Sequence, residues 1–139
     1  MGTFVKRHSQ RAEPAGRDDR GAAAVEFALV LPILLLLLGG IIDFGFAFNT
    51  QISLTHAARE GVRVEALDSG DAVEVALAAF TAPAATDAAA VIDRACEPNS
   101  DGSARVVVTA NSRIFFVGLL PFVDNQLPLE GQAVMRCGG

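Results

Sequence analysis

The residue whose chemistry most needs explaining is Glu26, a carboxylate at the start of the longest apolar run of the chain. It lies in the stretch RGAAAVEFALVLP, residues 20–32. An ionised carboxylate beside hydrocarbon is costly unless a positive charge or hydrogen-bond donors accompany it. The position of Glu26 therefore calls for a specific reason.

The other reactive side chains do not form a catalytic or metal-binding set. His8 lies in a polar head, and His56 has no Cys or second His at the spacing of metal ligands. The sequence has no Gly-rich phosphate loop and no G-x-S-x-G motif. We expect no catalytic residue, no metal site, no cofactor and no enzymatic activity, and we expect most acids to form a solvated face.

Two cysteines, Cys96 and Cys137, could form a disulfide if the part of the chain that carries them is outside the cytoplasm. Closing a loop of about 40 residues would stabilise a small domain by roughly 4 kcal/mol on the loop-entropy model. The alternatives are two independent thiols, or a bridge to another chain.

The apolar run extends from Phe27 to Phe48 and contains one charged residue, Asp43. A helix of 22 residues is about 33 Å long and can cross a hydrocarbon core of roughly 30 Å. A cleaved signal peptide is the alternative, but the run is longer than an ordinary signal-peptide core and no A-x-A-like site follows it. We expect an uncleaved membrane span.

The charges on the two sides of this run have opposite signs. Residues 1–20 contain five basic residues and three acids, whereas residues 49–139 contain six arginines and eleven acids. A basic head before a membrane span is typical of a protein whose N-terminus stays in the cytoplasm and whose C-terminal body is exterior. No basic face is available for phosphates, so we expect no nucleic-acid binding.

The pattern beyond the span predicts an α+β body. The first helix should continue to about Leu67, where Asp68-Ser69-Gly70 ends it, and a second should start at Asp71 and stop before Pro83. The alanine-rich residues 86–96 predict a third helix, and residues 104–118 and 129–137 predict antiparallel strands.

We thus expect a long N-terminal transmembrane helix that extends into a small exterior domain of short helices followed by a small antiparallel sheet. The predicted organisation is a cytoplasmic leader (1–21), a transmembrane helix (22–48), its extension (49–68) and the exterior α+β domain (69–139).

The segment Gly21-Ala22-Ala23-Ala24-Val25-Glu26-Phe27 resembles the processing site of type IV prepilin-like proteins, which are cut after the Gly. Residues 21 to about 67 resemble the TadE/TadF group of pseudopilins from tight-adherence (Flp) pilus systems, through VEFALVLPILLLLLGGIIDFG and AAREGVR. The major Flp pilin is similar at its start but is usually far shorter and has Tyr where this chain has Phe27. The resemblance therefore implies a minor or accessory subunit.

This resemblance implies that a prepilin peptidase cuts after Gly21 and makes Ala22 the new N-terminus. The freed amine would lie about 6 Å along a helix axis from Glu26, and Glu26 of one subunit could pair with the amine of a neighbour. Glu26 and Phe27 would then serve assembly, with other pilin or pseudopilin subunits and an inner-membrane pilus platform as partners.

Two alternatives stay open at this point. Glu26 could lie among the cytoplasmic headgroups without a role. The whole chain could be an unprocessed, signal-anchored envelope protein whose exterior domain binds a ligand or partner.

Overall fold

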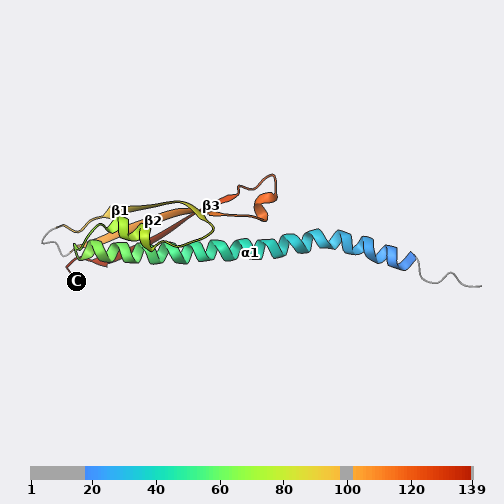
Figure 1. Cartoon of the computed structure of the whole chain (residues 1–139), viewed down its shortest axis with the longest axis horizontal. Coiled ribbons are helices and arrows are strands. Elements are labelled where there is room, and N and C mark those ends of the chain that lie inside the picture. The colour runs from blue at the N-terminus through green and yellow to red at the C-terminus, as the bar shows by residue number, and fades with distance from the viewer. Residues whose placement is uncertain (1–17, 98–101, 139) are drawn as a thin grey trace, which may run out of the picture. The chain divides into compact units, whose positions relative to one another are not determined.

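The computed structural model describes the backbone of residues 18–97 and 102–138, and the side chains from Gly21 onward. Its first element, α1 (Asp18–Ala66), is a single helix of 49 residues (Figure 1). It is followed by α2 (Ala72–Ala79), β1 (Ala85–Arg94), β2 (Ser103–Arg113), the short 3-10 helix η1 (Val117–Leu119) and β3 (Gln126–Arg136). The predicted α+β fold class is confirmed.

The contacts divide the chain into two units, one up to Leu35 and one from Leu36 onward. In the first unit, residues 21–30 of α1 are all exposed, including Phe27, Leu29 and Val30. By its length and composition, residues 21–66 of α1 form the one helix in the described part of the chain that could cross a membrane. A single apolar helix near the N-terminus indicates a single-pass membrane protein.

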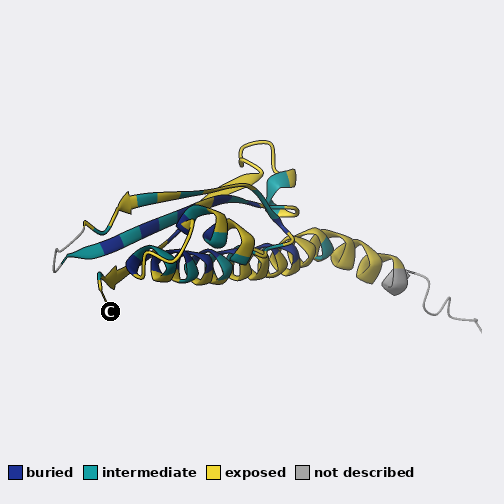
Figure 2. Ribbon diagram, turned by 60° about the vertical axis from the view of Figure 1, so that its left-hand side comes forward, coloured by how far each residue is buried: buried dark blue, intermediate teal, exposed yellow. Residues whose placement is uncertain are grey.

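The second unit is built around a three-stranded antiparallel sheet in the order β1-β2-β3. One face of the sheet packs on the C-terminal part of α1, as the buried residues in Figure 2 show. Leu54, Ala58 and Val62 of α1 form a core with inward-facing residues of the central strand, Val106 and Val108. The alternating burial of β2 is the expected pattern for a strand with one face on a core.

A glycine on the edge strand β3 allows the backbone of this strand to touch the helix. A Cβ at Gly131 would lie within 3 Å of the backbone of Leu54 and Thr55. Next to it, Gln51 donates from Nε2 to the carbonyl of Glu130 at 2.7 Å. The sheet is therefore held against α1 by backbone proximity as well as by apolar packing.

The prediction of a third helix over residues 86–96 was wrong, because these residues form β1 and the turn after it. Val91 pairs with Val107 and Ile92 with Val106 of β2. The helix preference of alanine amounts to only a few tenths of a kcal/mol per residue, and tertiary pairing overrides it. The described part of the chain after α1 thus contains one short α-helix, α2, rather than several.

The remaining elements follow the prediction closely. The α1 helix ends at Ala66, and Asp68 adopts a positive φ of 47° in the turn that follows. The side chain of Asp71 caps α2 by accepting from the N–H groups of Val73 and Glu74. The two predicted strands form β2 and β3 and pair antiparallel, although β2 ends at Arg113 instead of near Gly118.

Candidate functional site: the processing segment and the helix–loop junction

The residues predicted to be processed lie in the first turns of α1. Gly21 and Ala22 are exposed, and a Cβ added at Gly21 would meet nothing within 4 Å. The leader ahead of them, residues 1–17, lies outside the described residues. The bond after Gly21 is thus on an open surface of the helix.

The predicted assembly residues Glu26 and Phe27 follow one helical turn later. Both are exposed, and Phe27 retains 62% of its accessible surface. Among the side chains that the structure describes, Arg105 and Asp93 form an ion pair at 3.7 Å, and no cation pairs with Glu26. The carboxylate of Glu26 is therefore exposed and has no cation partner among the described side chains.

The structure reveals a structural role for Asp43, which the sequence marked only as the charge near the far end of the span. Asp43 is 5% exposed. Its Oδ1 accepts from the backbone N–H of Phe115 at 2.9 Å, and its Oδ2 accepts from Phe116 at 2.9 Å and Val117 at 2.8 Å. One carboxylate of α1 thus holds three consecutive amides at the start of η1, where charge-assisted hydrogen bonds are favourable.

The close approach of this loop to α1 depends on a glycine one turn before Asp43. A Cβ at Gly39 would collide with the Cβ and ring of Phe116. Nearby, the rings of Phe46 and Phe115 make an edge contact with their centroids 5.9 Å apart. The Gly39-Gly40 pair and the lone acid inside an apolar helix were the two sequence signals that could have indicated a docked loop.

The segment AAREGVR of α1, residues 57–63, packs against the C-terminal elements that follow the helix. Ala57, Ala58 and Val62 are buried in the core. At Gly61, a Cβ would lie 2.8 Å from the Cβ of Ala76 and 2.9 Å from the carbonyl oxygen of Ala72, so α2 crosses α1 there. The small residues of this segment therefore have a packing function.

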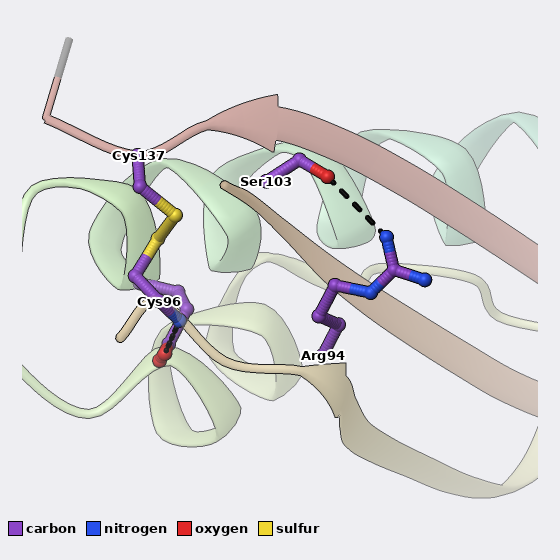
Figure 3. Close-up of a disulfide and its surroundings, with 5 residues drawn as sticks. Arg94, Cys96, Ser103 and Cys137 are labelled. Carbon is purple, nitrogen blue, oxygen red and sulfur yellow. Dashed lines mark hydrogen bonds between the residues drawn. A yellow bond between two sulfur atoms is a disulfide. The ribbon is translucent and has the colours of Figure 1, made fainter. Parts of the chain in front are cut away.

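The distal end of the body is closed by a disulfide between Cys96 and Cys137, whose Cα atoms are 5.7 Å apart. Figure 3 shows the bridge joining the chain just after β1 to the chain just after β3, beside the hydrogen bond from Arg94 to Ser103. Glu65 of α1 accepts from the N–H of Cys96 at 3.2 Å. The predicted bridge is present and lies next to the end of α1.

The structure keeps these sites on separate parts of the chain. The processing and assembly residues lie in the first unit, whereas Asp43 and the disulfide lie in the second. His56 is exposed on α1. Within residues 18–97 and 102–138, no three His, Cys, Asp or Glu side chains are placed to hold a metal ion.

One family model matches the chain, that of the TadE-like proteins, over residues 21–63. No curated protein and no solved structure gives a significant match. The matched region starts at Gly21 and ends with the AAREGVR segment, so it contains Glu26, Gly39 and Asp43. The membrane helix and its extension, residues 21–63, thus carry the sequence signature of the TadE-like family.

Proposed function

We propose that this protein is a minor pilin- or pseudopilin-like subunit of a tight-adherence (Flp, type IV-like) pilus assembly system. It is processed after Gly21 by a prepilin peptidase and held in the membrane until it assembles. The observation that carries this proposal is the family match, which begins at the residue where processing is expected and includes the exposed Glu26, with which no cation among the described side chains pairs.

Processing would supply a positive charge for Glu26 that the side chains from Gly21 onward do not supply. Removal of residues 1–21 leaves an α-amine on Ala22, one helical turn from Glu26. In a bundle of such helices the amine of one subunit pairs with Glu26 of its neighbour, and each pair removes the cost of an isolated carboxylate at the membrane. The exposed apolar side chains around Glu26 would pack against the same neighbours.

The body would lie outside the cytoplasm, with the N-terminus inside. The basic composition of residues 1–20 supports this orientation. The Cys96–Cys137 disulfide supports it independently, since such bonds persist in oxidising compartments. The expected partners are the peptidase, other pilin or pseudopilin subunits, and the inner-membrane pilus platform.

Co-expression with a prepilin peptidase tests the proposal. Removal of 21 of the 139 residues of this 14.5 kDa chain should lower its mass by about 2 kDa. Gly21→Val should abolish the shift. Gly45→Val is the matched control, because Gly45 lies in the same helix and a Cβ there also meets nothing within 4 Å.

The alternative function, a signal-anchored envelope protein with a ligand-binding exterior domain, predicts a different result. In that case the peptidase leaves the mass of the wild-type chain unchanged, and both glycine variants behave like wild type. A loss of about 2 kDa that Gly21→Val blocks and Gly45→Val does not would exclude this alternative.

A further inference from the structure

We propose that the connection between β2 and β3, residues 114–125, is a second membrane contact that lies in the exterior surface layer of the bilayer crossed by α1. We call this connection the apolar loop. The inference adds a lipid-binding surface to the proposed function, and it requires that α1 spans the membrane.

The first observation is the position of the apolar loop along α1. Phe116 lies over Gly39, the N–H groups of residues 115–117 bind Asp43, and Phe115 touches Phe46. All three helix residues lie in the C-terminal half of the apolar run Phe27–Phe48. Figure 1 shows η1 and its flanking turns extending past the sheet along α1. A bilayer that surrounds this part of α1 therefore reaches the loop.

The second observation is the composition and exposure of the apolar loop. Its sequence is IFFVGLLPFVDN, in which Asp124 is the one charged residue. Phe122 is 95% exposed and Leu119 is 79% exposed. Four more large apolar side chains are also partly or largely exposed, those of Phe115, Phe116, Leu120 and Val123. A patch of this kind on a small domain marks a surface that meets something other than water.

The third observation is that most backbone N–H groups of the apolar loop already have hydrogen-bond acceptors within the chain. Lipid excludes irregular backbone whose polar groups lack partners. In residues 114–123, Pro121 has no N–H. Seven others donate their N–H within the chain, to Asp43 or to backbone carbonyls, namely Ile114, Phe115, Phe116, Val117, Leu119, Leu120 and Val123. Seven of the nine N–H groups in this stretch are thus paired within the chain, which an exposed loop in water does not require.

The surroundings of Asp43 also agree with a loop that lies in the membrane surface layer. A carboxylate in the outer part of a membrane span is tolerated when donors satisfy it and side chains shield it. Three N–H groups surround Asp43, and its exposure is 5%. The same bonds hold the loop at this level of the helix.

The apolar surface of the loop is continuous with that of the membrane span, and this continuity identifies lipid as the partner that covers the loop. On α1 at the level of the loop, Ile41, Phe44 and Phe48 are between 58% and 67% exposed. Between helix and loop lies an open hollow of about 190 Å³ lined mainly by apolar residues, including Phe44, Ala47 and Val117. Helix surface, hollow and loop form one apolar face, and acyl chains that cover the helix also reach the loop.

The chain contains no Trp and no Tyr, so a single introduced Trp reports its own environment alone. The test uses the full-length chain in vesicles of phosphatidylcholine and phosphatidylglycerol, with and without brominated acyl chains. Phe122→Trp and Leu119→Trp place the probe in the apolar loop. Val91→Trp is the control, because Val91 is 60% exposed and pairs with Val107, six residues along β2 from its membrane-proximal end.

Flotation first isolates the vesicles that have bound the protein. In these vesicles, the Trp fluorescence of Phe122→Trp and of Leu119→Trp should have its maximum at a shorter wavelength than that of the Val91→Trp control. Brominated lipid should lower their emission about twofold or more, as for aromatic side chains at a membrane interface, and leave the control nearly unchanged. The second loop probe keeps the test informative if one variant does not fold.

Three results would overturn the inference. Loop probes that behave like the control in floating vesicles would place the loop in water. Loop emission that shifts only at high protein-to-lipid ratio would assign the patch to a second copy of the chain. Failure of the chain to float would reject the membrane span itself, and with it the membrane stage of the proposed function, whereas the first two results leave that function untouched.

Discussion

The carboxylate of Asp43 in α1 accepts a hydrogen bond from the backbone N–H of Val117 at 2.8 Å, across 74 residues of sequence. With the bonds from Phe115 and Phe116, it fixes the connection between β2 and β3 to the apolar part of the helix. The C-terminal body, residues 72–138, is thus attached to α1 at both ends, by Asp43 at one and beside the disulfide at the other.

Replacing Asp43 with Asn should loosen this connection and leave the rest of the fold intact. Hydrogen bonds to a charged group contribute about 1.5–3 kcal/mol each, so amide exchange at Phe115, Phe116 and Val117 should accelerate about tenfold or more. Asp124→Asn removes a charge from the same loop at an exposed position and serves as the control. Equal exchange rates in wild type and Asp43→Asn would show that the three bonds do not hold the loop.

Substitution of Gly131 with Ala should destabilise the C-terminal body, because the added methyl meets the backbone of Leu54 and Thr55, which cannot rotate away. Overpacking costs typically 1–3 kcal/mol, and contact with backbone places this change at about the upper end. Thermal unfolding in detergent, followed by circular dichroism, measures the effect.

Gly45→Ala is the matched control for Gly131→Ala, since a Cβ at Gly45 meets no atom within 4 Å. It should be neutral, or stabilise α1 by up to about 1 kcal/mol through helix propensity. If the two alanine variants unfolded at the same temperature, the close crossing of β3 over α1 would be refuted.

The disulfide should contribute a large share of the stability of the body. Cys96 and Cys137 are 41 residues apart, and the loop-entropy model gives roughly 4 kcal/mol for a loop of this size. The double variant Cys96→Ala with Cys137→Ala should unfold at a lower denaturant concentration than wild type. The intact mass of the wild-type chain after alkylation checks the bridge. The chain should gain two adducts only if it is reduced first, and adducts without reduction would contradict the disulfide.

Changing Glu26 to Ala should leave membrane insertion unchanged while strongly reducing incorporation into a pilus or pseudopilus. Glu26→Gln keeps the shape of the side chain and should fail equally, since the proposed contact is an ion pair with the Ala22 amine of a neighbour. Glu74→Ala, at an exposed position on α2, is the control. Immunoblots of membrane fractions measure insertion, and immunoblots of sheared pilus fractions measure incorporation. Normal incorporation of Glu26→Gln would contradict the role assigned to the charge of Glu26.

The elements that local sequence determines were predicted well. The length and apolarity of residues 27–48 indicated the span, and Asp71 indicated the start of α2. The strand β1 was missed because its alanines favour a helix locally, whereas its structure is set by pairing with β2.

The candidate sites likewise divide into those that a local motif indicates and those that depend on contacts between distant residues. Gly21 and Glu26 could be named as candidates because their motif is contiguous in the sequence, and their roles stay predictions. The role of Asp43 was missed because its partners are 72 to 74 residues away and are backbone amides, which no residue type reveals. An acid in an apolar helix predicts that a partner exists, and only the fold shows which one.

Sequencing the N-terminus of the membrane-bound protein after co-expression with a prepilin peptidase tests the central claim most directly. The account predicts a sequence that begins Ala22-Ala23-Ala24-Val25-Glu26, with a free α-amine on Ala22. A terminus that still begins at Met1 would contradict both the processing at Gly21 and the pairing proposed for Glu26.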